Sequence, residues 1–125
     1  MLANTKAYSG FAVDDMAKAR EFYDERLGLK VSVLDEGNLL SLHLAGGRDT
    51  LVYLKPDFVP ATYTILNFAV DDVDEIVDGL TARGVQFERY EGFEQDEKGI
   101  ARGDGTDIAW FKDPAGNILS IVTDA

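Results

Sequence analysis

Apolar and polar positions alternate with a two-residue period and then change to a helical period, and this change occurs twice along the chain. The pentapeptide Phe-Ala-Val-Asp-Asp stands at 11–15 and again at 68–72. Each copy closes a run of strand type, at 8–13 and 65–70, and is followed by apolar positions three or four residues apart, up to a glycine. The repeat therefore predicts two copies of one strand-to-helix corner.

The two aspartates of each copy have a local explanation. A carboxylate at the start of a helix accepts hydrogen bonds from free backbone N–H groups and opposes the positive end of the helix dipole. Asp72 also precedes Glu75 by three residues, which is the spacing of a capping box. We therefore interpret Asp14 or Asp15, and Asp71 or Asp72, as helix caps and not as metal ligands or acid–base groups.

Three further runs of strand type follow each predicted helix, separated by turn residues. They lie at 30–34, 39–44 and 50–54 after the first helix, and at 85–90, 107–112 and 118–122 after the second. The prolines of the connector 55–60 suit a link and not a central strand. The pattern predicts an α+β fold of two βαβββ modules, about 1–56 and about 62–125, in a single domain spanning 1–125.

Composition narrows the range of partners. The chain has no cysteine, so it can build neither a thiolate metal site nor a cysteine nucleophile, and a reducing cytoplasm is the simplest location. Twenty-three acidic residues against twelve basic ones give a charge of −11, which repels nucleic acid and anionic membranes, favours cationic partners, and is also common on ordinary soluble surfaces. The apolar runs are too short to cross a bilayer. We expect a cytoplasmic protein that binds neither nucleic acid nor membranes.

Two longer motifs resemble a known family. Glu-Phe-Tyr-Asp-Glu-Arg-Leu-Gly-Leu-Lys-Val at 21–31 and Phe-Lys-Asp-Pro-Ala-Gly-Asn-Ile-Leu-Ser-Ile-Val at 111–122, with the repeated modules, resemble the vicinal oxygen chelate (VOC) superfamily of glyoxalase I, extradiol dioxygenases, fosfomycin-resistance enzymes and bleomycin-binding proteins. The resemblance covers essentially the whole chain. It implies a VOC domain of the glyoxalase/bleomycin resistance fold, a half-barrel cavity on the sheet face away from the helices, and a homodimer. Fold alone selects no function within this superfamily.

The resemblance also implies four positions for metal ligands, which are His, Gln or Glu in the metal-dependent members. These positions fall on Tyr8 and Ile65 in the first strands, on Ser120, and on Val52 or its neighbour Tyr53. A divalent site needs several nitrogen or carboxylate ligands that converge on one point. We therefore predict no metal and no cofactor, with an unorthodox site built on His43, Tyr8 and a loop carboxylate as the alternative.

Strand alternation supplies candidate ligand contacts. Tyr8 and Asn67 lie on corresponding faces of the two first strands beside small residues, Ser120 lies on the last strand, and the resemblance places Trp110 on the cavity side. His43 faces away from the neighbouring leucines and is either a pocket hydrogen-bonding group or general base, or a solvent-side residue. The candidate ligand-binding residues are therefore Tyr8, His43, Asn67, Trp110 and Ser120, and no catalytic residue is assigned.

Two other features carry no predicted chemistry. The acidic, glycine-punctuated segment 91–105 is either a lid over a cavity mouth or a solvated loop, and it lacks a phosphate-binding motif. The serines at 9, 32, 41 and 120 match no nucleophile-elbow pattern, and a single histidine leaves little for a Ser-His-Asp arrangement.

These observations favour a metal-free small-molecule-binding protein of the glyoxalase/bleomycin-resistance type. Its ligand, held in the half-barrel cavity, is apolar or aromatic, and a cationic molecule of this kind is one candidate. The alternative is a metal-independent isomerase or lyase acting on a small carbonyl compound, with His43 or Tyr8 as the acid–base group. A third is an oligomerisation or regulatory module with a vestigial cavity. Ligand identity, catalysis and pathway stay open, as does whether one chain or a dimer forms the cavity.

Overall fold

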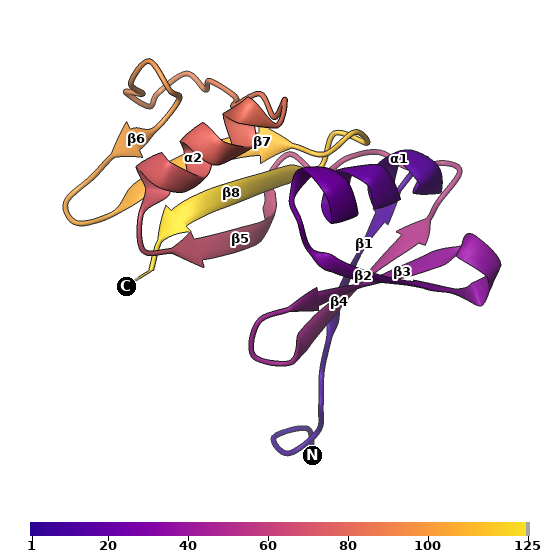
Figure 1. Cartoon of the computed structure of the whole chain (residues 1–125). Coiled ribbons are helices and arrows are strands. Elements are labelled where there is room, and N and C mark those ends of the chain that lie inside the picture. Colours follow the sequence, from indigo (N-terminus) through magenta and orange to yellow (C-terminus); the bar gives the residue numbers. More distant parts are fainter. Residues whose placement is uncertain (125) are drawn as a thin grey trace. The chain divides into compact units, whose positions relative to one another are not determined.

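The computed structural model describes residues 1–124, in which the chain divides between Phe58 and Val59 into two compact units. Each unit holds one open, four-stranded mixed sheet and one α-helix after its first strand (Figure 1). In both units the first strand is parallel to the last one and the other pairs are antiparallel. The repeated pentapeptide thus marks the same step in two units of one topology, and the expected α+β fold is confirmed.

The first unit follows the prediction closely. Its sheet has the order β1-β4-β3-β2, and its elements are β1 (Ser9–Val13), α1 (Met16–Arg20), a π-helical segment (Glu21–Arg26), β2 (Lys30–Leu34), a 3-10 turn (Asp35–Gly37), β3 (Leu39–Leu44) and β4 (Arg48–Leu54). The Asp15 side chain caps α1 by accepting from the Lys18 N–H at 3.1 Å. Tyr23 in the π-helical segment is fully buried, and its ring lies 5.6 Å from that of Phe11 on β1. The helical face of this sheet is therefore the apolar one.

The second unit repeats this arrangement with the order β5-β8-β7-β6. Its elements are β5 (Thr64–Val70), α2 (Val73–Ala82), β6 (Ala101–Arg102), β7 (Asp107–Lys112) and β8 (Ile118–Thr123). Asp72 caps α2 by accepting from the Glu75 N–H at 3.1 Å. The helix buries Val73 and Val77 as it packs against β7 and β8 (Figure 1). Both predicted helix caps are therefore confirmed.

The prediction of a strand at 85–90 is wrong. Only Phe87 makes an isolated bridge, to Phe111, and the edge strand of this sheet is β6, a dipeptide further along the chain. The Glu88 N–H still donates to the Trp110 carbonyl at 2.8 Å. The Gln95 side-chain amide, however, donates to the Glu88 carbonyl at 2.9 Å and accepts from the Tyr90 N–H at 2.8 Å, so these two backbone groups are bonded to a side chain instead of a strand.

None of the helices formed by residues 1–124 combines the length and apolar character needed to span a bilayer.

Candidate functional site

Three of the predicted ligand contacts lie in one row across the second sheet. Trp110 on β7 is the cross-strand partner of Ser120 on β8, and Ser120 is the partner of Asn67 on β5. Cross-strand partners point to the same face of a sheet. Phe111, the next residue after Trp110, is fully buried on the opposite face, which α2 covers. The row therefore lies on the face away from the helix.

The polar end of the row is one hydrogen-bonded pair. The Ser120 hydroxyl donates to the Asn67 side-chain oxygen at 2.5 Å, and Ser120 is fully buried whereas Asn67 is exposed. Within residues 1–124 the Asn67 amide nitrogen makes no hydrogen bond, so its two donors are available. The serine thereby orients an amide that can donate to an acceptor placed on this face.

The other end of the row is an aromatic cluster. The Trp110 ring lies 5.5 Å from that of Tyr90 in an edge-on arrangement and 5.0 Å from that of Phe93. Phe93 is 56% exposed, so the cluster offers an aromatic surface to solvent. Sequence reasoning missed Tyr90 and Phe93, because it assigned one to a strand and the other to a possible lid. Trp110 thus packs beside two aromatic rings from the segment that precedes β6.

The Tyr90 hydroxyl is buried and has no hydrogen-bond partner within residues 1–124. Burial, with a smaller contribution from the nearby Glu88 carboxylate, raises the pKa of the Tyr90 phenol. A buried polar group without a partner costs about 1–3 kcal/mol. Groups of this kind are rare in folded proteins and are often functional, so the cluster combines an exposed ring with an unpaired donor.

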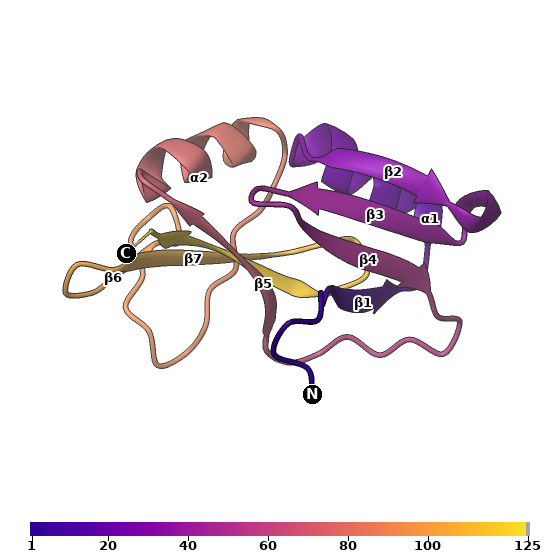
Figure 2. The ribbon, with the colours of Figure 1, turned by 90° about the horizontal axis from the view of Figure 1, so that it is seen from below.

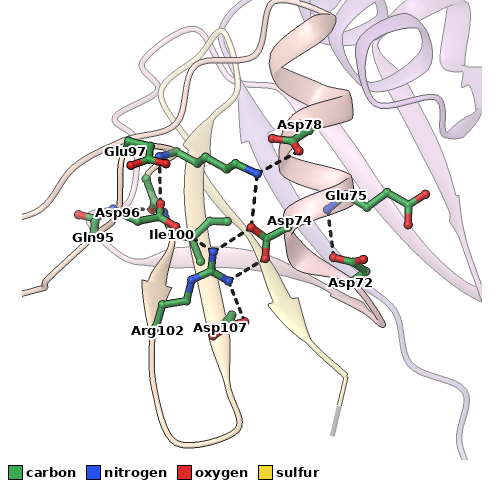
Figure 3. A network of polar contacts seen from close by, with 12 residues as sticks. Asp72, Asp74, Glu75, Asp78, Gln95, Asp96, Glu97, Ile100, Arg102 and Asp107 are labelled. Carbon is green, nitrogen blue, oxygen red and sulfur yellow. Dashed lines mark hydrogen bonds and ion pairs between the residues drawn. The ribbon is translucent and has the colours of Figure 1, made fainter.

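The segment after the aromatic cluster is anchored to α2 through Arg102 (Figure 3). The Arg102 guanidinium donates to both Asp74 oxygens, at 2.7 and 2.8 Å, and also to Asp96 at 2.8 Å and Asp107 at 3.1 Å. Lys98 adds a second connection to the helix, with 3.4 Å to Asp74 and 3.0 Å to Asp78. The second half of segment 91–105 is therefore connected to α2 by ion pairs.

These ion pairs predict how stability depends on pH. The Arg102 hydrogen bonds, followed by the contact with Lys98, lower the pKa of Asp74 from 3.8 to about 2. Because the folded-state pKa is the lower one, the stabilisation is complete above the ordinary aspartate value and is lost as the pH falls toward 2. We expect the difference in Tm between the wild type and Asp74→Asn to shrink as the pH falls from about 4 to about 2. Thermal melts across that range measure the difference.

Asp71→Asn is the matched control for this pH experiment, because Asp71 is exposed and makes no ion pair in the described part of the chain. Its Tm difference from the wild type should vary much less with pH. A constant Tm difference for Asp74→Asn across the same range would contradict the anchoring role of Asp74.

The other two predicted contacts belong to the first unit. Tyr8 directly precedes β1 and is 72% exposed. His43 on β3 lies between two polar partners, with its Nε2 2.6 Å from the Ser32 hydroxyl and its Nδ1 3.0 Å from the Asp49 carboxylate. His43 is therefore a partnered side chain at the solvent-exposed surface of its sheet.

The four positions implied for metal ligands do not fit a divalent ion. The register pairs Asn67 with Ser120 in the second unit and Gly10 with Leu51 in the first, so the position equivalent to Ser120 is Leu51. The expected Val52 or Tyr53 is wrong by at least one residue, and Val52 is instead fully buried, paired with Phe11. A register of this kind is set by strand pairing, which no motif at 50–54 reveals.

The resulting donor set is a phenol at Tyr8, alkyl chains at Leu51 and Ile65, and the Ser120 hydroxyl that is bonded to Asn67. Zinc and the other divalent ions of such sites bind imidazole, carboxylate or amide groups. Among residues 1–124, no group of three or more His, Cys, Asp or Glu side chains is arranged to hold a metal ion. The implied metal centre therefore has no fitting ligands at its expected place.

The family model of the Glyoxalase/Bleomycin resistance protein/Dioxygenase superfamily matches residues 7–121 of the chain. A search of curated proteins found no match.

Three similar solved structures illustrate the range of proteins that share this fold. TnmS3, an antibiotic binding protein from Streptomyces sp. CB03234, has a TM-score of 0.71 and 22% identity over 98% of both chains. Lactoylglutathione lyase from Agrobacterium tumefaciens has a TM-score of 0.68 and 20% identity over 97% of this chain and 95% of its own. A glyoxalase/dioxygenase from Nostoc punctiforme has a TM-score of 0.70 and 18% identity over 99% of this chain and 94% of its own. At these identities the likeness concerns the fold.

Proposed function

The chain belongs to the glyoxalase/bleomycin resistance protein/dioxygenase superfamily, and we propose that within it this protein binds a small aromatic molecule without a metal ion. The observation that carries the proposal is the row Trp110, Ser120 and Asn67, with Tyr90 and Phe93 beside the indole. Apolar and aromatic surface with a few oriented polar groups is the usual composition of a small-molecule site.

The geometry favours a planar ligand with a hydrogen-bond acceptor. A ring packed beside Trp110 and Phe93 would gain aromatic contacts worth about 0.5–1.5 kcal/mol each. An acceptor on that ligand can bond to the free Asn67 amide. The ligand would thus be held by stacking and oriented by the Asn67 amide.

The surrounding charge favours a cationic version of such a ligand. Glu91 and Glu94 flank Phe93, and the whole chain carries a charge of −11. A cation over the face of an aromatic ring is stabilised by the ring quadrupole. The similarity in fold to an antibiotic binding protein agrees with this ligand class. A cytoplasmic location, a half-barrel cavity and a homodimer stay part of the proposal.

The single tryptophan of the chain makes the proposal directly measurable. Titration with bleomycin or with planar aromatic cations should change Trp110 fluorescence in a saturable way, with a Kd below about 1 mM. The same compounds should raise the Tm, and a chelator should alter neither result. Binding that is lost on addition of chelator, or no binding better than millimolar from a broad panel of aromatic compounds, would refute the proposal.

Two variants and one control locate the ligand on this face. Asn67→Ala and Phe93→Ala should each weaken binding by about tenfold, which corresponds to one hydrogen bond or one aromatic contact. Asn4→Ala removes another exposed amide, outside both sheets, and should leave the Kd unchanged. Equal effects of all three substitutions would place the ligand elsewhere.

The metal-independent isomerase or lyase is the second candidate function. The hydrogen bond from His43 to Asp49 supports it, because a carboxylate-oriented imidazole can act as a general base. The Tyr8 hydroxyl makes no hydrogen bond to His43 or to any other group within residues 1–124, so it adds no matching acid. The aromatic face, formed by Trp110, Ser120 and Asn67 with Tyr90 and Phe93 beside the indole, offers a ligand more contacts than His43 does, and we therefore place binding first.

A further inference from the structure

A serine, a histidine and an aspartate lie on three adjacent strands of the first sheet, far from the aromatic face in sequence. Ser32 is on β2, His43 on β3 and Asp49 on β4, and these strands are neighbours in the sheet (Figure 2). The Ser32 hydroxyl oxygen lies 2.6 Å from His43 Nε2, and His43 Nδ1 lies 3.0 Å from the Asp49 carboxylate. Both distances are those of ordinary to short hydrogen bonds.

The order of these atoms determines the direction of the hydrogen bonds. A carboxylate can only accept, so Nδ1 of neutral His43 carries the proton and donates it to Asp49. Nε2 then has a free lone pair and accepts from the Ser32 hydroxyl. This is the arrangement in which an imidazole acts as a base toward a serine.

We propose that Ser32 is a nucleophile that His43 activates and that accepts an acyl group from small activated esters. Asp49 acts as a positioning residue, because it orients the imidazole and stabilises its protonated form without touching the ester. The proposal does not depend on the aromatic face, since all three residues belong to the first unit. It also revises the expectation that one histidine leaves little room for a Ser-His-Asp arrangement.

The reaction follows from the positions of the protons. Ser32 Oγ bonds to the acyl carbon while its proton passes to His43 Nε2. The ester oxygen then leaves and takes that proton, so an alcohol departs and an acyl-serine remains. Water, deprotonated by the same nitrogen, attacks the acyl-serine, and the proton returns to Ser32 as the carboxylic acid leaves. The sum is one ester and one water converted to one acid and one alcohol.

The surroundings define the class of ester. The side chains of His43 and Asp49 are 38% and 49% exposed, and β2 is an edge strand, so the site opens to solvent and has no enclosed acyl pocket. Lys30 is the direct cross-strand partner of His43 and shares its face, where a positive charge favours a developing oxyanion. Short acyl groups on good leaving groups, such as aryl acetates, are therefore the expected substrates.

A fluorophosphonate probe and p-nitrophenyl acetate test the proposal on the full chain. The probe should label one serine, and peptide mapping should assign the label to Ser32. Ser32→Ala and His43→Gln should each lower the rate of p-nitrophenol release by about 100-fold. Ser9→Ala is the matched control, because the Ser9 hydroxyl is bonded to Thr50 at 2.8 Å and not to a histidine, and it should leave the rate unchanged.

A loss of rate in His43→Gln but not in Ser32→Ala would mean that the imidazole itself attacks the ester, and this would overturn the proposal. Absence of labelling at Ser32, or equal rates in Ser32→Ala and Ser9→Ala, would overturn it as well. Thermal melts of each variant separate a loss of chemistry from a loss of folding.

Nitrogen NMR gives an independent readout of the positioning role, because the chain has only one histidine. The His43 nitrogens should report the tautomer protonated at Nδ1, which is the less common form of free imidazole. Asp49→Ala should shift the population toward the Nε2-protonated tautomer and lower the esterase rate by at least about tenfold. A wild-type protein with its proton on Nε2 would contradict the proposed direction of the hydrogen bonds.

Discussion

Phe111→Ala is expected to lower the free energy of unfolding by about 3–5 kcal/mol, which is the usual cost of removing a fully buried aromatic ring from a core. The Phe111 side chain is inaccessible to solvent, and its ring lies 5.6 Å from that of Phe87. It comes from β7, which α2 covers. Truncation to alanine leaves a cavity between the sheet and α2, and the surrounding elements can close it only in part. Chemical denaturation followed by circular dichroism measures the loss.

Trp110→Ala is the matched comparison, because Trp110 is the preceding residue and points to the other face of the same strand. Its side chain is only partly buried, so its removal should cost clearly less stability than that of Phe111. Under the proposed function it should instead abolish aromatic ligand binding. If the two substitutions destabilised the protein equally, the division of β7 into a core face and a ligand face would be wrong.

Element bounds and helix caps could be predicted from sequence because they depend on local signals. Runs 30–34, 39–44 and 107–112 form strands with the predicted bounds, and Asp15 and Asp72 cap the two helices. In each case the deciding signal lies within a few residues of the element, either as alternation or as a capping aspartate.

Features that depend on pairing between distant segments could not be predicted in this way. The apolar alternation at 85–90 suggested a strand, but Gln95 occupies two of the backbone groups that a ladder would use. The expected Val52 or Tyr53 proved to be Leu51, because strand register is a property of two strands and not of one.

The candidate site residues also divide into those with a local sequence signal and those that only strand pairing brings together. Asn67 and Ser120 are predicted from strand alternation and Trp110 from the family resemblance, and the register of β5, β8 and β7 brings the three into one row. Ser32 and His43 are eleven residues apart, and no spacing rule predicts that their side chains meet across two strands. Likewise, the loop residues Tyr90 and Phe93 have no periodic signal that would associate them with Trp110.

The turn that joins β7 to β8 supports the second of the large predictions. Asp113 is 4% exposed, and its carboxylate accepts from the backbone N–H groups of Ala115 at 3.0 Å and Asn117 at 2.8 Å, and from the Asn117 side-chain amide at 2.9 Å. Asn117 is itself 2% exposed. The motif Asp-Pro-Ala-Gly-Asn therefore builds its turn around a buried carboxylate, and Gly116 supplies the positive φ of 94° that the turn requires.

We expect Asp113→Ala to lower the free energy of unfolding by about 3 kcal/mol, because hydrogen bonds to a charged group are each worth about 1.5–3 kcal/mol and a buried amide loses a partner. Asp113→Asn keeps one acceptor oxygen and should lose less. Asp104→Ala, at an exposed aspartate in the turn between β6 and β7, should change stability by no more than about 0.5 kcal/mol.

The consequence for function follows from the position of this turn. It joins the strands that carry Trp110 and Ser120, and those residues are partners only while the β7–β8 register holds. Asp113→Ala should therefore weaken aromatic ligand binding even at temperatures where the protein is still folded, and Asp104→Ala should not. If Asp113→Ala bound the ligand as tightly as the wild type while losing 3 kcal/mol of stability, the turn would serve folding alone. In that case the aromatic face would not depend on the register that this motif sets.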